Sequence, residues 1–264
     1  MNIFWRELKT SRKALIIWSV CMFLLVISGM AKYTAYSSGA TFNDIFSKMP
    51  SSLKALLGIG SFDVTTPIGF FGLLFPYVEV TAAIHAILLG AGIIAKEEND
   101  KTIEFLMVKP VSRTSVITAK LTAALFNVVV INIVSLVACI LMVGAYNKGP
   151  SLSGTIAVFI ASMFIVQLIF LSLGAAIAGV LKNPKSAASL ATGMLLVAYM
   201  VSKITDLKSS LNFLNLISPF KYFDLNQIVA GKGINAGIAL LSLALVAILS
   251  ASTYIFYKRR DLKV

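Results

Sequence analysis

The sequence predicts an all-α membrane protein with six transmembrane helices in a single transmembrane domain over residues 1–264. Composition is the first observation, because 58% of the 264 residues are hydrophobic and only 13% are charged. Soluble domains contain about half apolar and about a quarter charged residues. The second observation is the length of the apolar runs, since a hydrocarbon core about 30 Å thick requires roughly 20 helical residues to cross it. Both observations place the chain in a membrane.

Six apolar runs are long enough, or nearly long enough, to cross a bilayer as helices. They cover residues 14–31, 68–95, 121–145, 155–181, 187–201 and 237–257. The fifth run is short and is the weakest candidate. The first run, with basic residues before it and small residues after it, also resembles a secretory signal peptide, but it is longer than the usual apolar core of about 7–15 residues.

The distribution of basic residues predicts that both termini are cytoplasmic. With the N-terminus inside, the inner segments hold 15 of the 23 lysines and arginines, although the outer loops are much longer. Cytoplasmic loops of membrane proteins carry an excess of Lys and Arg. We therefore expect a multi-pass protein of the cytoplasmic (plasma) membrane. The net charge of +12 favours anionic lipid of the inner leaflet, and not nucleic acid, as the partner of these residues.

Residues 1–13 predict a short helix that lies in the cytoplasmic interface. Phe4 and Leu8 are one turn apart with Trp5 beside them, and the basic residues of the segment point elsewhere. This pattern places the aromatic side among the lipid headgroups. The alternative interpretation is a charged flank of the first span.

The last outer loop, residues 202–235, combines leucines at helical spacing with aromatic residues after Pro219. The aromatic residues are Phe220, Tyr222 and Phe223. This combination predicts short helices that dip part-way into the outer leaflet or cap a cavity. A plain interfacial belt of aromatic residues is the alternative.

Recognisable catalytic motifs are missing from the sequence. It has one histidine, no cluster of metal ligands, no G-x-S-x-G nucleophile elbow and no G-x-x-x-x-G-K-[ST] loop for nucleotide phosphates. We therefore do not expect an enzyme, and we expect this chain to bind no metal or cofactor.

Glu79 is the only acid clearly inside a predicted span, and a carboxyl at that depth is costly enough to suggest a function. Its helical face continues through Ala82, Ala86 and Gly90. Small residues of this kind let another helix approach closely. The pattern indicates a translocation path or a helix interface.

A purely structural role is the alternative for Glu79. Its carboxyl could be kept neutral, or could hydrogen-bond to Asn127, Asn132 or Gln167. His85 lies about 240° around the same helix from Glu79 and cannot share its face. We interpret His85 as a structural hydrogen-bonding residue.

The loop over residues 96–114 carries an apolar run, IEFLMV, which is too short to cross a bilayer. Asn99 or Asp100 can cap the start of a short helix, Pro110 can end it, and Ser112 can cap the third span. Two surfaces are needed to shield these apolar side chains from water. The membrane interface can cover one, and a partner protein with a hydrophobic groove would cover the other.

At these residues the sequence resembles the ABC-2-type permeases, which are membrane subunits of ABC exporters. The shared pattern is a pair of glutamates, then T-x-E-x-L, then K-P-V-S-R, found at residues 97–98, 102–106 and 109–113, with Lys120 further on. Many members have glycine where Lys101 stands. The resemblance extends over the whole chain, including MPSSLKALLGI and TPIGFF in the first outer loop, LISPFKYFD in the last one, and the closing Y-x-K-R-R-D-L.

The resemblance implies the ABC-2-type exporter fold, with an N-terminal interfacial helix, a cytoplasmic coupling helix and a partly re-entrant last outer loop. It implies a homodimer around a central path, and two copies of a separate ABC ATPase subunit that bind ATP and Mg and drive alternating access. The ATPase-coupling residues that it implies are Glu98, Thr102, Ile103, Glu104, Phe105, Leu106, Met107, Pro110 and Arg113.

The substrate that we expect is hydrophobic or amphipathic: a peptide, an antimicrobial or a drug. No chain of charges suited to an ion path is visible beside Glu79. ABC export of sodium ions or polysaccharide remains an alternative. A secondary transporter or channel using Glu79 is another, although no paired broken helices are visible. An intramembrane enzyme is a third, but Glu79 and His85 lie on different faces.

Overall fold

Six long helices make up most of the protein. The computed structural model describes residues 3–37, 48–50, 53, 63–100, 102, 111–181, 183–207 and 209–259. The long helices are α1 (Ile3–Met30), α5 (Pro67–Asn99), α7 (Arg113–Tyr146), α8 (Ser153–Val180), α9 (Ala187–Leu207) and α11 (Ala236–Arg259). The short elements are α2 (Tyr33–Ser37), η1 (Pro184–Ser186), η2 (Ser209–Leu216), η3 (Pro219–Lys221) and α10 (Leu225–Val229). All six long helices are long and apolar enough to cross a membrane, which confirms the prediction of six spans.

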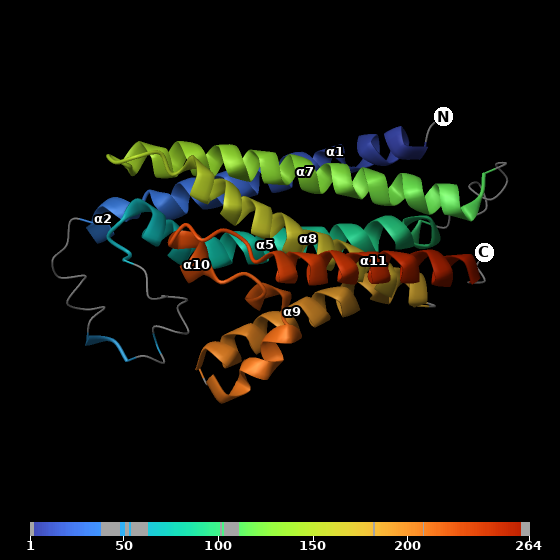
Figure 1. Ribbon diagram of the computed structural model, residues 1–264. Helices are drawn as coiled ribbons and strands as arrows, with labels where there is room; N and C mark the ends of the chain where they lie inside the picture. Colours follow the sequence, from blue (N-terminus) through green and yellow to red (C-terminus); the bar gives the residue numbers. More distant parts are fainter. Residues whose placement is uncertain are drawn as a thin grey trace.

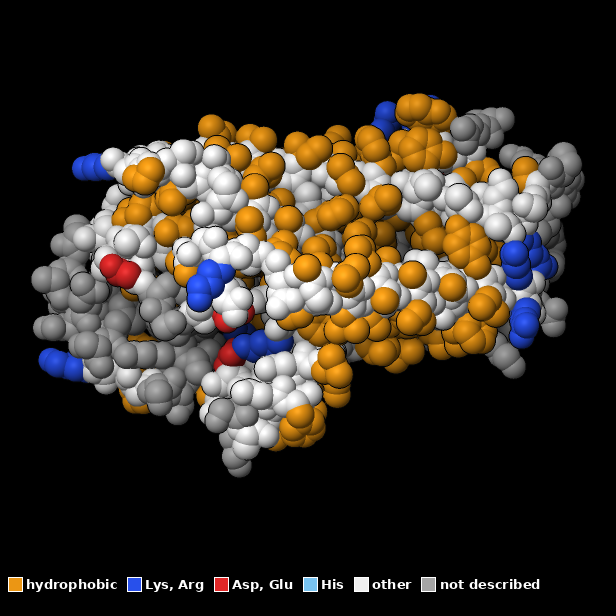
Figure 2. Space-filling model, in the orientation of Figure 1, with side chains coloured by type: hydrophobic (Ala, Val, Ile, Leu, Met, Phe, Trp, Pro, Cys, Tyr) orange, Lys and Arg blue, Asp and Glu red, His pale blue; other side chains and the backbone are white. Residues whose placement is uncertain are grey.

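The centre of the bundle is the pair α5 and α8 (Figure 1). In their most apolar stretches, 67% and 61% of the residues are buried, compared with 17% in α1 and 11% in α11. Helix α1 packs along α7, α11 packs on α8, and α9 packs on α5. The outer helices therefore expose apolar side chains along the length of the bundle, and Figure 2 shows this apolar surface with most charged side chains near its ends.

Two glycines bring α5 and α8 into backbone contact. A Cβ atom on Gly90 would lie 2.1 Å from the carbonyl oxygen of Leu171, and one on Gly174 would lie 2.3 Å from the carbonyl oxygen of Ile87. Neither position leaves room for a methyl group. The small residues thus set the distance between the two central helices.

The N-terminal segment differs from the prediction of a separate interfacial helix over residues 1–13. Helix α1 runs without interruption from Ile3 to Met30, so the described part of this segment forms the first turns of the first span. The physical reason is the packing of Glu7, which is buried and pairs with Lys96 of α5, so that these turns are held against the bundle. The charged-flank alternative fits this geometry better.

Helix boundaries elsewhere extend the predicted runs. Helix α5 continues to Asn99, α7 begins at Arg113, and α9, the weakest candidate, continues to Leu207. Ser112 caps α7 as predicted, because its Oγ accepts a hydrogen bond of 3.1 Å from the backbone N–H of Ser115. Most of the first outer loop lies outside the described residues.

The loop after α9 folds back onto the central helices. The rings of Phe170 in α8 and Phe220 in η3 lie 5.0 Å apart, and Tyr222 and Phe223 are buried. Helix α10 contacts both α5 and α8, with Ile228 buried. This packing agrees with short helices that cap the bundle and not with a plain aromatic belt.

Both ends of the described chain lie at one end of the bundle, which we call the terminal end. It holds the start of α1, the end of α5, the start of α7 and the end of α11 (Figure 1). Helices α2 and α10 lie at the opposite end. An even number of spans requires this arrangement of the two chain ends.

Candidate coupling and translocation site

The predicted coupling helix lies mostly outside the described residues. This applies to six of the predicted coupling residues: Ile103, Glu104, Phe105, Leu106, Met107 and Pro110. The structure does describe Glu98, Thr102 and Arg113, which flank that stretch. Glu98 is half-buried in the last turn of α5, whereas Thr102 is exposed and its backbone N–H donates a 2.8 Å hydrogen bond to the carbonyl oxygen of Glu97.

The end of α5 before this segment is held by a buried network of charges, which we call the terminal ion network. Its members are Arg6, Glu7, Lys96, Glu97 and Lys120, from α1, α5 and α7. The residues Glu7, Glu97 and Lys120 are 2%, 3% and 0% exposed. Charges this deeply buried are stable only when they are paired and hydrogen-bonded.

Glu97 is the residue that joins all three helices. Its Oε1 lies 2.7 Å from Nη2 of Arg6 in α1, and its Oε2 pairs with Nζ of Lys120 in α7. Lys120 Nζ also donates to the carbonyl oxygen of Ile93. Glu7 in turn pairs with Arg6 at 2.8 Å and with Nζ of Lys96 at 2.9 Å. The bonds connect the first, second and third spans at one level.

The other end of the coupling segment is tied to the last span. Arg113, the first residue of α7, donates from Nη1 to the carbonyl oxygens of Lys258 at 3.1 Å and Tyr257 at 3.5 Å. These oxygens belong to the last turn of α11, where backbone carbonyls have no partner within the helix. A cation near a helix C-terminus also interacts favourably with the helix dipole.

Sequence reasoning missed the terminal ion network as a site. It assigned Lys120 and the glutamate pair to the coupling pattern and counted Arg6 and Lys96 only as inner basic residues. A signal was present, because Glu7 and Glu97 are acids among the many basic residues of the predicted inner segments. Their position there indicates that each has a basic partner.

Helix α8 packs on the small-residue stripe of Glu79. Ala82, Ala86 and Gly90 are all buried, and the Nε2 group of Gln167 in α8 donates a 3.3 Å hydrogen bond to the carbonyl oxygen of Ala82. Glu79 itself is 6% exposed. The stripe is therefore a contact between helices within one chain.

The three amides considered as partners of Glu79 bond elsewhere. Asn132 pairs with Gln167 through side-chain atoms, and Asn127 donates to the carbonyl oxygen of Ala123 at 2.7 Å. The carboxyl of Glu79 is buried and forms no ion pair within the described residues, and Lys203 and Lys221 act on it only electrostatically. The hydrogen-bonded form of the structural alternative is therefore not seen, and its other form, a neutral carboxyl buried for packing, agrees with the 6% exposure of Glu79.

A second group of charges lies where α9 and η3 meet. Asp206 pairs with Lys221 and lies 3.9 Å from Nζ of Lys203. The ammonium of Lys203 lies 5.6 Å from the ring centre of Tyr199. The Tyr199 ring in turn packs against Phe220 at 5.6 Å. This arrangement gathers charges and aromatic rings into one cluster, and its two lysines act electrostatically on the carboxyl of Glu79.

His85 lies buried in the bundle beside α1. Its Nδ1 is buried without a hydrogen-bond partner in the described part of the chain. The ring packs edge-on against Trp18 of α1, with 5.2 Å between ring centres. The contact joins α1 to α5 through aromatic packing.

The fold and these ion networks define a polytopic α-helical membrane protein whose ionic contacts gather at the helix ends. Within the described residues, no three potential metal ligands lie together. The family model of the ABC-2 family transporter protein matches residues 1–262, so the chain belongs to that family. A search of curated proteins finds no match. Membership makes this chain the permease subunit of an ABC transporter and implies an ABC ATPase subunit as its partner.

Proposed function

We propose that this permease exports a hydrophobic or amphipathic substrate across the cytoplasmic membrane, using ATP hydrolysis on the partner subunit. A peptide, an antimicrobial or a drug is the class of substrate. Two copies of the chain would pair around the path, each with one ATPase subunit that binds ATP and Mg. Both termini and the coupling segment would face the cytoplasm.

The anchoring of the coupling segment at both ends is the observation that carries the proposal. The end before it is bonded to α1 and α7 through Glu97, and the end after it is bonded to α11 through Arg113. A displacement of this segment by a partner would therefore act on four helices together. Ion pairs and hydrogen bonds that have discrete arrangements are a physical means of passing such a displacement on.

The surroundings of Glu79 support an amphipathic substrate. They combine positive and negative charges at Lys203, Lys221 and Asp206 with the aromatic rings of Tyr199 and Phe220. Sites for organic ligands combine apolar walls with a few polar groups in this way.

The coupling test compares two apolar positions in the segment with a lysine that precedes them in the sequence. Phe105→Asp or Leu106→Asp should weaken copurification of the ATPase subunit, because a buried anchor contributes ~2 kcal/mol or more, about thirtyfold in affinity. Lys101→Glu is the matched control and should cost only ~0–1 kcal/mol. The measurements are copurification and substrate-stimulated ATP hydrolysis in proteoliposomes at matched protein levels. Asp variants that bind the partner and couple normally would refute the proposal.

A variant of Arg113 separates partner binding from transmission. Arg113→Gln should leave the ATPase subunit bound, but lower substrate-stimulated ATP hydrolysis, because the link to α11 is lost.

Transport of a fluorescent amphipathic peptide into inside-out vesicles should require ATP and persist when a protonophore collapses the proton gradient. Uptake that follows the gradient and ignores ATP would indicate a secondary transporter.

A further inference from the structure

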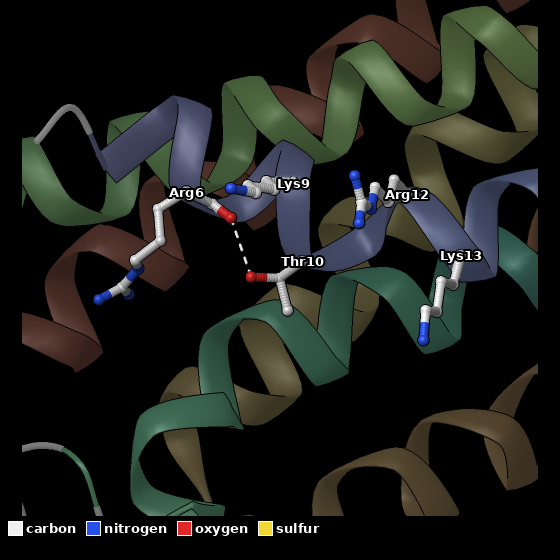
Figure 3. A pocket seen from close by; sticks show the side chains of 5 residues that line it. All are labelled: Arg6, Lys9, Thr10, Arg12 and Lys13. Atoms are coloured by element: carbon white, nitrogen blue, oxygen red, sulfur yellow. Dashed lines mark hydrogen bonds between the residues drawn. The ribbon is translucent and has the colours of Figure 1, made fainter.

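A basic hollow lies on the first turns of α1. It has a volume of about 450 Å³ and is lined by Arg6, Lys9, Thr10, Arg12 and Lys13. Figure 3 shows these side chains along α1, with the Thr10 hydroxyl donating a 2.9 Å hydrogen bond to the carbonyl oxygen of Arg6. Four cations thus line the hollow within about two helical turns.

Three of these cations are not neutralised within the described part of the protein. Arg6 is paired with Glu7 and Glu97. Lys9, Arg12 and Lys13 are exposed, and no described acid forms an ion pair with them. Like charges at this spacing repel one another on a helix. An anion in the hollow would relieve that repulsion.

The hollow lies directly beside the lipid-facing part of the same helix. Ile16 and Ile17 are 61% and 62% exposed. Ile16 follows Lys13 by only three residues. At 1.5 Å per residue, that is about 4.5 Å along the helix axis. Trp5 is also exposed, and tryptophan prefers the level of the lipid headgroups. The charges therefore lie at the level of lipid phosphates, with apolar surface for the acyl chains just beyond them.

We propose that this hollow binds the phosphate of an anionic phospholipid, held by Lys9, Arg12 and Lys13, while the acyl chains lie along Ile16 and Ile17. Long basic side chains reach the headgroup level from a helix in this way. An acidic surface of a partner protein would match the charges, but it would leave the neighbouring apolar surface uncovered. The lipid matches both, which favours it. The binding does not depend on the direction or the substrate of transport.

The test is lipid binding by the full-length, delipidated protein. Phosphatidylglycerol or phosphatidylcholine is titrated in detergent, and bound lipid is counted by native mass spectrometry. The variant is Lys9→Gln, Arg12→Gln and Lys13→Gln together. The control neutralises three exposed lysines away from the hollow, Lys32, Lys148 and Lys232, and so makes the same change in net charge.

We expect tight binding of phosphatidylglycerol but not phosphatidylcholine. One basic residue near an anionic surface is worth about fivefold in affinity, so the triple variant should bind roughly 100-fold more weakly and the control should change much less. Equal losses of phosphatidylglycerol affinity in the triple variant and in the control would overturn the proposal, because binding would then follow net charge alone. Competition by inorganic phosphate at the same concentration as the lipid would assign the hollow to a soluble anion instead.

Two further outcomes are decisive. If phosphatidylglycerol binding is unchanged but the triple variant loses its ATPase subunit, the hollow is a protein interface and the proposal is wrong. If the triple variant does not fold, as judged by gel filtration and circular dichroism, Lys9→Gln with Lys13→Gln replaces it, and a roughly 25-fold loss is expected. Loss of lipid binding with normal transport would leave the proposed function intact.

Discussion

Replacing Glu97 by glutamine should destabilise the protein more than any other single change in the terminal ion network. The substitution keeps the size of the side chain but removes its charge. The side chain of Lys120 is fully buried, with 0% exposure, and Glu97 is the acid that pairs with it. In Glu97→Gln that ammonium keeps the carbonyl oxygen of Ile93 as its hydrogen-bond partner but loses its ion-pair partner.

Removing one partner of a buried ion pair costs about 3–5 kcal/mol, because an uncompensated charge is left behind. We expect a loss in this range for Glu97→Gln. Lys120→Met should cost less, because Glu97 keeps its 2.7 Å bond to Arg6, whose side chain is 29% exposed. The double variant should lose less than the sum of the two single losses, by about 0.5–3 kcal/mol.

Unfolding in mixed micelles with an increasing fraction of dodecyl sulfate measures these free energies, and tryptophan fluorescence reports the transition. Asp100→Asn is the matched control, since this acid is exposed at the end of the same helix, and its effect should stay within about 0.5 kcal/mol. A Glu97→Gln variant as stable as that control would refute the reasoning. Strict additivity in the double variant would show that Glu97 and Lys120 are not energetically coupled.

Gly90→Ala should destabilise by about 1–3 kcal/mol, because its Cβ would lie 2.1 Å from a carbonyl oxygen of α8, whereas Gly92→Ala has open space within 4 Å and should be neutral or slightly stabilising in the same unfolding assay. Glu79→Gln should reduce transport in vesicles without lowering expression, and full transport by this variant would leave Glu79 with a packing role alone. In a cysteine-free background, a cysteine at Lys148 should react with a membrane-impermeant thiol reagent in intact cells, and one at Asn99 should not. Labelling at Asn99 from outside would contradict the proposed orientation.

The six spans could be predicted because their signal is local. Length and hydrophobicity alone decide whether a helix can cross the hydrocarbon, and the cap at Ser112 depends on a residue three positions away. Glu79 was identified for the same reason, since an acid within an apolar run is visible without any knowledge of its neighbours.

The contacts of these residues could not be predicted in the same way. Arg6 and Glu97 are separated by 91 positions, and their pairing depends on how α1 packs beside α5. The same packing explains why α1 is continuous, because Glu7 finds a partner in α5 only if these turns stand against the bundle. The lysines beside Glu79 come from a later span and from the loop after it. A single sequence carries no pattern that pairs such distant positions.

The bond from Arg113 to α11 constrains the amino acids at its two ends to different degrees. The acceptors are main-chain oxygens at positions 257 and 258, and the side chain of Lys258 is exposed. Almost any residue at position 258 supplies the same oxygen, whereas the donor at position 113 is a side-chain group that most other residues lack. The two sides of one contact therefore differ in mutational tolerance. Natural variants should be diverse at position 258 and restricted at position 113.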